Sequence, residues 1–465
     1  GGIWSNSSTN QYSYMWRNQL NYSFDLAEKH HFNIDLGHEM SSVQYRGQNS
    51  GTIPGYAPEQ GESFIPIWAG TPEIAQNYYW YLREWFMSSV SAKAFPTITD
   101  RKDNKLSFYL TSTYTYKNYF SVNFNIRNDG SNRFGQYESE KFNPVWSVSG
   151  RVNLNEFSFV NPDVVDMLAL RGSYGYRGSV PNATPYLIIS TPKKNNVSGE
   201  LGSTIPSNGY PNSNLKWEKT STFNLGLEYS LYRGRITGGI DAYYSKSTDL
   251  ISMRAASLVN GTSSMMYNDG TATNQGLEVS LATVNINTKD FKWRTSLTWS
   301  WNKNRIKQGS ATANSYTDYL QGSVVHEGSS IDGFFSYQFD GLDKYGLPRF
   351  KNLTGNPSKL SQEEFLNRVF AYSGTRTPTS YGSFSTEVAW KQFSFRAEFS
   401  YKLGYKQRLL ALYQDGNPAL PMPQDNMNNA FVRRWRKTGD EAFTTIPVLS
   451  NITLETPYPK TPPSA

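Results

Sequence analysis

Residues 217–231 have the sequence Trp217-Glu218-Lys219-Thr220-Ser221-Thr222-Phe223-Asn224-Leu225-Gly226-Leu227-Glu228-Tyr229-Ser230-Leu231. Apolar and polar side chains alternate along it, so that Phe223, Leu225 and Leu227 share one face. Thr222, Asn224 and Glu228 share the other. This period of two predicts a β-strand. Its length of about fifteen residues far exceeds the usual five or six of soluble proteins, and a membrane-crossing strand needs roughly 9–11.

The same alternation recurs in pairs of segments. Five predicted hairpins have short turns, namely 16–26 with 31–40, 105–116 with 119–128, 217–231 with 234–246, 275–286 with 291–302, and 380–390 with 393–404. A looser pair, 143–154 with 166–177, is joined by a somewhat longer segment that contains Pro162. Long segments rich in Gly, Pro, Ser and Asn separate the hairpins, at about 41–103, 129–142, 178–216, 247–273 and 303–379. Short periplasmic turns and long extracellular loops are typical of outer-membrane barrels. We therefore predict an all-β protein, a transmembrane antiparallel β-barrel with about a dozen strands in this chain.

The composition favours a barrel over other classes. Aromatic residues reach 15%, whereas mean hydropathy is −0.59 and no run approaches the roughly 18–20 apolar residues of a spanning helix. Barrels use aromatic residues as girdles at both membrane interfaces. Cysteine is absent, which excludes disulfides and Cys-ligated metals. The net charge is +7, but Lys and Arg are scattered singly, so we expect solvated loops and a polar lumen rather than a nucleic-acid partner.

Neither end of the chain has the features expected at the end of a complete exported barrel. Gly1-Gly2-Ile3-Trp4 does not resemble a signal peptide, and residues 456–465 contain four prolines, which cannot donate to a strand ladder. In lipid an open sheet edge is not viable, because every backbone group needs a partner. We therefore expect residues 1–465 to be a partial barrel with long extracellular loops.

Several strands and turns of the chain carry distinctive motifs. The main ones are Arg127-Asn128-Asp129-Gly130-Ser131-Asn132-Arg133-Phe134-Gly135, Leu170-Arg171-Gly172-Ser173-Tyr174-Gly175-Tyr176, Asn214–Thr220 with Phe223–Glu228, and Asn274–Glu278 with Trp299–Asn304. Fainter ones are Asp343–Pro348, Tyr381–Phe384 and Arg434–Asp440. In order and spacing, these motifs resemble the SusC/RagA-type TonB-dependent outer-membrane transporters of Bacteroidetes-like bacteria, and they cover nearly the whole chain.

The resemblance implies a larger barrel of about 22 strands around an N-terminal plug, with TonB reached through a plug region absent from this chain. It also implies a SusD-like lipoprotein lid, and location in the outer membrane of a Gram-negative bacterium, in contact with its lipid. The implied function is active import of an oligosaccharide or peptide nutrient, without a cofactor or catalysis. Two alternatives stay open, a passive porin and a non-transporting barrel that serves as a scaffold in a surface assembly.

The sequence gives few candidates for binding residues. The loop segment 78–86 is dense in aromatic side chains, which are favoured in protein interfaces. Its candidate partner or ligand contacts are Tyr79, Trp80, Tyr81 and Trp85. The four histidines, His30, His31, His38 and His326, lack zinc-site spacing. We assign no catalytic, metal-ligating or substrate-binding residue.

A second candidate group is the charged motif at the end of one predicted strand. Arg127, Asp129 and Arg133 flank Gly130 and are candidates for a substrate-binding cluster. We favour a structural rim motif, in which Gly130 makes the turn and the charges pair with neighbouring loops.

Overall fold

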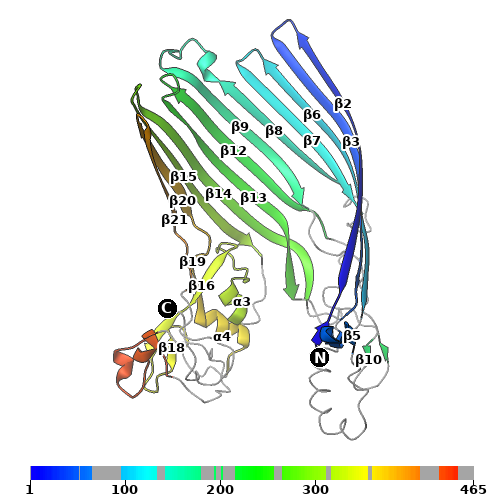
Figure 1. Ribbon diagram of the computed structural model, residues 1–465, viewed down its shortest axis with the longest axis vertical. Helices are drawn as coiled ribbons and strands as arrows, with labels where there is room; N and C mark the ends of the chain where they lie inside the picture. The colour runs from blue at the N-terminus through cyan, green and yellow to red at the C-terminus, as the bar shows by residue number, and fades with distance from the viewer. Residues whose placement is uncertain are drawn as a thin grey trace. The chain divides into compact units, whose positions relative to one another are not determined.

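The computed structural model describes residues 2–51, 53–64, 96–132, 142–179, 193–194, 201–202, 215–255, 264–309, 316–353, 359–408 and 429–448. Its main element is a sheet of 12 strands in the order β2-β3-β6-β7-β8-β9-β12-β13-β14-β15-β20-β21 (Figure 1). The strands are β2 Ser7–Leu26, β3 His30–Asn49, β6 Thr97–Tyr116, β7 Phe120–Ser131, β8 Phe142–Asn153, β9 Val165–Ser179, β12 Glu218–Leu231, β13 Ile236–Ala255, β14 Ser264–Asn287, β15 Phe291–Gln308, β20 Ser380–Trp390 and β21 Phe393–Leu403. No helix among the described residues is long and apolar enough to cross a membrane.

All the predicted hairpins form, and their short turns lie where the sequence placed them. The turn between β12 and β13, for example, has Tyr232, Arg233 and Gly234 at positive φ, the conformation that tight hairpins require. Several strands run further than expected. β13 and β14 remain paired from Leu250 with Gly270 to Ala255 with Ser264, so that most of the segment 247–273, expected to be a loop, is strand.

The chain divides into two compact units, which we describe separately. The first comprises Gly1–Tyr22, Ile34–Thr111 and Arg127–Pro144, and the second Ser23–Asn33, Ser112–Ile126 and Val145–Ala465. Besides the long strands, the first contains β1 Gly2–Trp4, β4 Ile53–Ala57, η1 Pro58–Gln60 and β5 Ser63–Phe64, and the second η3 Leu154–Glu156, β10 Lys193–Lys194 and β11 Leu201–Gly202.

The long strands have one apolar and one polar face. In the second unit Phe223 and Leu225 are 48% and 45% exposed, an arrangement that lipid would cover. On the opposite face, hydroxyl groups bond across the β12–β13 ladder, with Thr222 Oγ1 2.9 Å from Ser245 Oγ. The first unit repeats the pattern on β2, where Trp16 and Leu20 are exposed while Gln19 and Asn21 donate to Asp35.

The segment 303–379, expected to be a long loop, contains a folded region that we call the loop module (residues 316–353 and 359–375). Its elements are α3 Tyr316–Gln321, β16 Gly333–Tyr337, β17 Phe339–Leu342, β18 Pro348–Phe350, α4 Gln362–Val369 and β19 Phe370–Thr375. They enclose a core of Tyr319, Val324, Phe335, Phe350, Phe365, Leu366, Val369 and Phe370. Helix α4 begins at a capping box, in which Ser361 and Glu364 satisfy each other's backbone N–H groups.

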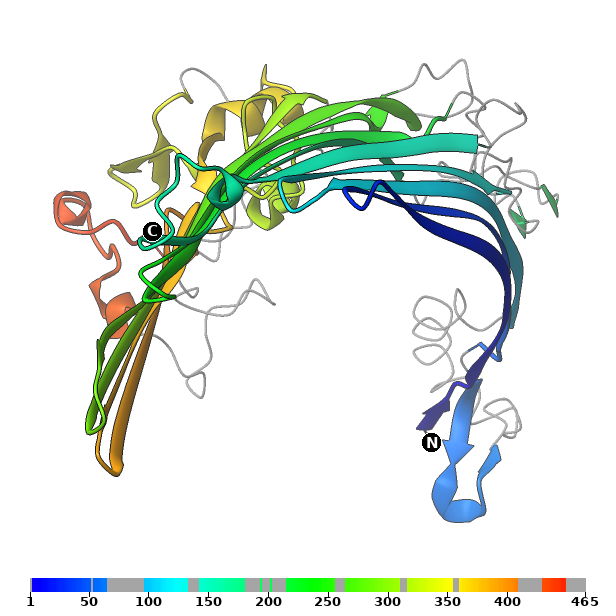
Figure 2. The same cartoon turned by 90° about the horizontal axis from the view of Figure 1, so that it is seen from above.

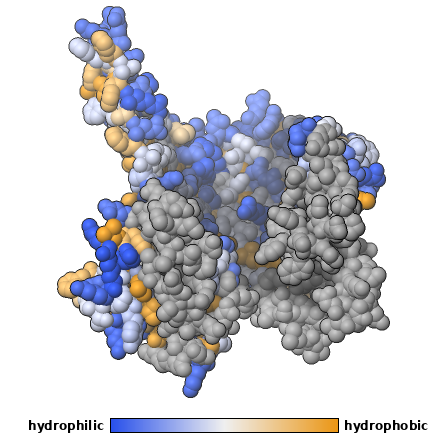
Figure 3. Space-filling model, turned by 60° about the horizontal axis from the view of Figure 1, so that its bottom comes forward, coloured by the Kyte–Doolittle hydropathy of each residue, from blue (hydrophilic) through white to orange (hydrophobic). Residues whose placement is uncertain are grey.

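A C-terminal segment, residues 429–448, packs against this module. It contains η7 Asn429–Arg433 and η8 Asp440–Ala442 and is orange-red beside β18 (Figures 1 and 2). The backbone N–H of Val448 donates to the carbonyl of Gly346 over 3.0 Å, and the ring of Trp435 lies against the same glycine. At this end of the molecule the described surface mixes hydrophilic and hydrophobic residues (Figure 3). Two of the fainter sequence matches, 343–348 and 434–440, therefore meet here.

Candidate functional site: charged side chains on the polar face

A network of four charges lies on the polar face of the first unit. We call it the β7 network, and its members are Arg17 on β2, Glu39 on β3, and Arg127 and Asp129 on β7. Nε of Arg127 is 2.6 Å from Oδ1 of Asp129, and its Nη2 is 3.8 Å from Oε1 of Glu39. The other oxygen of Glu39 is 2.6 Å from Nη2 of Arg17.

This network crosses β6, which lies between β3 and β7, at a small residue. Ser107 on β6 is 3% exposed, and its hydroxyl accepts a hydrogen bond of 2.8 Å from Nη2 of Arg127. A larger side chain there would block the path of the arginine toward Glu39. The guanidinium also lies 5.8 Å from the centre of the Tyr109 ring. Arg127 is thus held by its own strand and by both of the next two strands.

The structure shows the positions of only some of the candidate site residues that the sequence suggested. Arg127, Asp129 and Gly130 lie on β7. Arg127 pairs with Asp129 on its own strand and with Glu39 on β3, whereas the sequence predicted pairing of these charges with neighbouring loops. Gly130 is not in a turn: it lies inside β7, and the ring of Phe142 packs so closely on it that a Cβ would sit 2.5 Å from that ring. Arg133 lies outside the described residues, as do Tyr79, Trp80, Tyr81 and Trp85.

A second network of the same kind lies in the second unit and was not expected from the sequence. We call it the β12 network, and its members are Arg151 on β8, Arg171 on β9, Glu228 on β12 and Asp241 on β13. Glu228 bridges two arginines, with Oε2 2.7 Å from Nη1 of Arg151 and Oε1 3.1 Å from Nη1 of Arg171. Nη2 of Arg171 in turn lies 2.7 Å from Asp241 Oδ1.

Both networks pair two positive with two negative side chains, so that each is close to neutral at pH 7. Their carboxylates are more buried than their guanidinium groups; Asp241 is 22% exposed and Arg171 43%. Charges paired and fixed in this way line a surface with hydrogen-bonding groups without concentrating one sign of charge. The arrangement suits a wall along which a polar solute moves, and it provides no nucleophile–base pair for covalent chemistry.

The histidines make local contacts at separate places. Nδ1 of His31 is 2.5 Å from Asp25 Oδ1, Nδ1 of His30 is 2.8 Å from the Tyr114 hydroxyl, and Nε2 of His38 is 3.0 Å from Asn18. His326, in the loop module, lies 2.9 Å from the carbonyl oxygen of Glu327. Within the described ranges, three or more His, Asp or Glu side chains do not gather where they could hold a metal ion.

Comparison with known proteins shows similarity to TonB-dependent receptors in each case. The family model described as "TonB dependent receptor-like, beta-barrel" matches residues 2–413. The TonB-dependent receptor SusC of Bacteroides thetaiotaomicron is 32% identical over 287 residues, which cover 57% of this chain and 28% of that protein. The TonB-dependent receptor P3 of Formosa agariphila is 25% identical over 342 residues, covering 68% of this chain and 33% of that protein.

Among solved structures, the RagAB peptide importer in its open-open state matches 96% of this chain and 46% of that chain, with a TM-score of 0.72 at 22% identity. This similarity confirms the predicted barrel fold. The chain spans about a third or less of the length of the curated relatives named above. It belongs to the TonB-dependent receptor-like β-barrel family of the bacterial outer membrane.

Proposed function

We propose that this chain is part of the wall of a TonB-dependent importer, which takes up an oligosaccharide or peptide nutrient across the outer membrane. The observation that carries this proposal is the pair of faces on the long strands. The apolar face exposes Phe223 and Leu225, whereas the polar face carries the β12 network of paired charges. A wall of this kind separates lipid from a water-filled interior that a polar nutrient can enter.

The proposals for the substrate class, the plug, TonB and the lipoprotein are based on the relatives. Two of them are named TonB-dependent receptors, and a protein of the same fold is described as a peptide importer. We propose by analogy that the whole protein has a plug that engages TonB and a SusD-like lipoprotein that covers the extracellular side. Import of a bulky solute would then proceed by capture under the lid, enclosure above the plug, and release after TonB pulls on the plug.

Particular residues of the chain have proposed roles in this cycle. We propose that Tyr79, Trp80, Tyr81 and Trp85 contact the lid, because Tyr and Trp bury large areas with little loss of conformational freedom. We propose a structural role for Arg127, Asp129 and Gly130, supported by the contacts of Arg127 to Ser107 and Glu39, and we extend it to Arg133 as part of the same motif.

Uptake by cells that carry the intact gene tests the proposal. Labelled oligopeptides and oligosaccharides are supplied to the parent strain, a strain lacking TonB, and a strain lacking the adjacent lipoprotein gene. An importer takes up one of the two classes, stops without TonB, and weakens without the lipoprotein. Uptake that persists without TonB would identify a passive porin. Absence of uptake of either class, with the barrel still at the cell surface, would favour a scaffold.

A further inference from the structure

Tyr109 on β6 lies across the neighbouring strand β3 on the polar face of the first unit. Its hydroxyl donates to Oε1 of Gln19 over 3.1 Å, and Gln19 belongs to β2, the strand on the far side of β3. The residue beneath the ring is Gly37 on β3, where a β-carbon would overlap Tyr109. The three atoms nearest to that β-carbon position all belong to Tyr109. Gly37 therefore lets the ring lie flat on the sheet.

A second tyrosine lies across a strand in the same way in the second unit. Tyr243 on β13 is opposite Gly276 on β14, and Gly276 is opposite Asn302 on β15. Nδ2 of Asn302 donates to the hydroxyl of Tyr243 over 2.5 Å, so this hydrogen bond spans β14. A β-carbon at Gly276 would lie 2.5 Å from the hydroxyl oxygen of Tyr243. The bond therefore also depends on the absence of a side chain on the strand between.

The β12 network crosses its middle strand at a glycine as well. Nη2 of Arg171 is 2.7 Å from Oδ1 of Asp241, and a β-carbon at Gly226 would lie 2.5 Å from atoms of both side chains. We call Gly37, Gly226 and Gly276 the crossing glycines. All three lie on the polar face, and each is covered by a long side chain that is bonded to the strand beyond.

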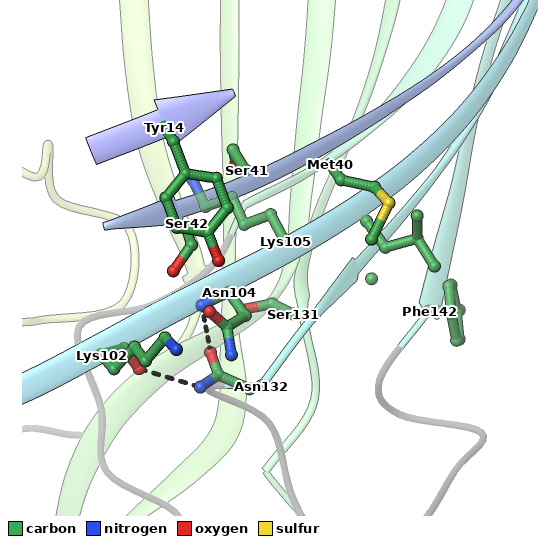
Figure 4. Close-up of a pocket in the computed structure, with 12 residues that line it drawn as sticks. Tyr14, Met40, Ser41, Ser42, Lys102, Asn104, Lys105, Ser131, Asn132 and Phe142 are labelled. Carbon is green, nitrogen blue, oxygen red and sulfur yellow. Dashed lines mark hydrogen bonds between the residues drawn. The ribbon is translucent and has the colours of Figure 1, made fainter. Parts of the chain in front are cut away.

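Two glycines of the apolar face have different surroundings. Phe142 on β8, which lines a cavity of about 480 Å³ (Figure 4), packs over Gly130 on the adjacent strand β7 and does not reach beyond it. At Gly238 on β13 the nearest atom is a backbone oxygen, that of Ser280. Packing of a ring and close approach of two strands explain these two glycines, and neither supports a hydrogen bond across a strand.

The crossing side chains change the relief of the wall. Side chains on a sheet normally stand roughly perpendicular to it, and a tyrosine or arginine on the polar face would then project into the interior. Tyr109, Arg171 and Tyr243 instead lie along the sheet, with the far end of each bonded on the second strand over. Adjacent strands are about 4.8 Å apart, so each of these side chains covers roughly 10 Å of wall. The polar face therefore has low relief at these three places.

We propose that the crossing glycines are positioning residues for import. They keep Tyr109, Arg171 and Tyr243 flat on the polar face, and this leaves clearance for a bulky solute and for a plug that moves past the wall. A β-carbon at Gly37 lifts the ring of Tyr109 into that space, where each passing body has to push it aside. The inference rests on the proposed import function and does not depend on which nutrient is imported.

Nitration of Tyr109 in the purified full-length protein measures the position of the ring. A water-soluble nitrating reagent attacks tyrosine rings that water reaches, and mass spectrometry of the peptides counts the product. We expect Gly37→Ala to increase nitration of Tyr109 several-fold. The matched control is Gly239→Ala, which should leave it unchanged: Gly239 is opposite Glu228 on the polar face, and a β-carbon there would have its nearest neighbours at 3.4 and 3.5 Å. Equal nitration in the wild-type protein and Gly37→Ala would overturn the proposal.

Uptake by cells that carry the intact gene shows whether the flat position matters for import. Labelled oligomers of increasing length, of the class that the wild-type protein imports, are supplied at several concentrations, and rates are divided by the number of barrels at the cell surface. We expect Gly37→Ala to lower the maximal rate for the longest oligomers about tenfold, the cost of roughly one hydrogen bond. The KM should change little, and the shortest oligomers should be much less affected.

A double variant separates obstruction from simple loss of structure. Gly37→Ala/Tyr109→Ala removes the displaced ring and should restore the rate, although the hydrogen bond to Gln19 is also lost. Tyr109→Ala alone should import at nearly the wild-type rate. A double variant as slow as Gly37→Ala, or a Gly37→Ala variant with fewer barrels but an unchanged rate per barrel, would show a purely structural role and overturn the proposal.

Two further outcomes are decisive. If Tyr109→Ala is as slow as Gly37→Ala, the ring itself is required rather than its flat position, and the proposal is wrong. If the wild-type protein shows no TonB-dependent uptake, the proposed import function fails, and this inference fails with it. Normal wild-type uptake with equal rates in Gly37→Ala and Gly239→Ala would refute the positioning role alone.

Discussion

Arg171 and Asp241 form an ion pair across an intervening strand, with Nη2 of the arginine 2.7 Å from each carboxylate oxygen. Arg171 is on β9 and Asp241 on β13, and β12 lies between them. The contact exists because the residue opposite both, Gly226, has no side chain. A β-carbon at Gly226 would lie 2.5 Å from Nε of Arg171 and 2.5 Å from Oδ1 of Asp241.

We therefore predict that Gly226→Ala destabilises the barrel by roughly 1–3 kcal/mol, because the methyl group displaces the arginine from its carboxylate. Gly172→Ala is the matched control, since a β-carbon there would have its nearest neighbours at 4.0 Å. The measurement is the midpoint temperature at which the folded barrel converts to the slower-migrating unfolded form in gels. Equal midpoints for the two variants would show that the open space at Gly226 is unimportant.

The bridging carboxylate Glu228 gives a second prediction. Glu228→Gln keeps the size of the side chain but leaves Arg151 and Arg171 without their shared negative charge. Because these groups are partly exposed, we expect a loss of only about 1 kcal/mol, smaller at high salt.

The control for this prediction is Glu398→Gln on β21. Glu398 is 3.5 Å from Arg396, and both side chains are at least 60% exposed, so this change should have no measurable effect. Both variants are compared by the same gel assay at low and high salt. A salt-independent loss in Glu228→Gln would mean that packing, and not charge, holds the network.

The hairpins could be predicted from the sequence for a physical reason. Lipid on one face and water on the other force a strict alternation of side chains, as in 217–231, and the short turns interrupt it. The alternation is broken in the paired extensions of β13 and β14 beyond Leu250, because apolar residues are adjacent there, as in Leu250-Ile251 and Met265-Met266. A period of two therefore does not predict these extensions as strands.

The charge networks show the limit of sequence reasoning most clearly. Arg171 and Glu228 both lie in stretches that carry the family resemblance, but Arg171 and Asp241 are 70 positions apart. Their contact depends on the register of two strand pairs, which a periodicity does not specify. The motif at 127–135 predicts a role for Arg127, whereas the roles of Glu39 and Ser107 depend on the alignment of β3 and β6 beside β7. The sequence does not predict the loop module, because its core residues alternate with turns and short helices.

The loop module contains a partly buried tyrosine, Tyr337, whose hydroxyl oxygen is buried. Burial raises the pKa of Tyr337 to about 12, and its hydroxyl has no hydrogen-bond partner among the described residues. Tyr337→Phe should therefore leave the module as stable at pH 7, or stabilise it slightly. Phe335→Ala, in the same core, should destabilise it by roughly 3–5 kcal/mol. Protease cleavage within residues 316–375 of the purified protein reports both changes.

The same tyrosine predicts a pH dependence. An unfolded tyrosine titrates near pH 10, so between pH 10 and about 12 the unfolded module loses a proton that the folded one keeps. The ionisation of Tyr337 therefore has no effect on the stability of the module below pH 10, and it lowers that stability as pH rises through the window from 10 to about 12. Tyr337→Phe should remove this part of the alkaline loss. Parallel pH curves for the wild-type protein and Tyr337→Phe would contradict the assignment.

The docking of the C-terminal segment on the loop module gives the last prediction. Gly346 has a φ of +78°, and a β-carbon there would lie 2.4 Å from the ring of Trp435. Gly328 in the same module has a φ of +84° but open space around it. Gly328→Ala therefore measures the cost of the backbone conformation alone, about 1 kcal/mol. Gly346→Ala adds the displacement of Trp435, whose Nε1 donates to Glu441 over 2.9 Å.

This bond to Trp435 lowers the pKa of the Glu441 carboxyl. The ionised carboxylate therefore stabilises the docked segment at pH values above the ordinary titration range of glutamate, and this stabilisation is lost as pH falls below that range. We expect protease cleavage within 429–448 to increase in Gly346→Ala and to be nearly unchanged in Gly328→Ala. Acidification should increase cleavage in the wild-type protein but have less effect on Gly346→Ala, in which the Trp435–Glu441 contact is already disturbed. Equal cleavage in the two alanine variants would show that backbone strain, and not the tryptophan ring, makes glycine necessary at position 346.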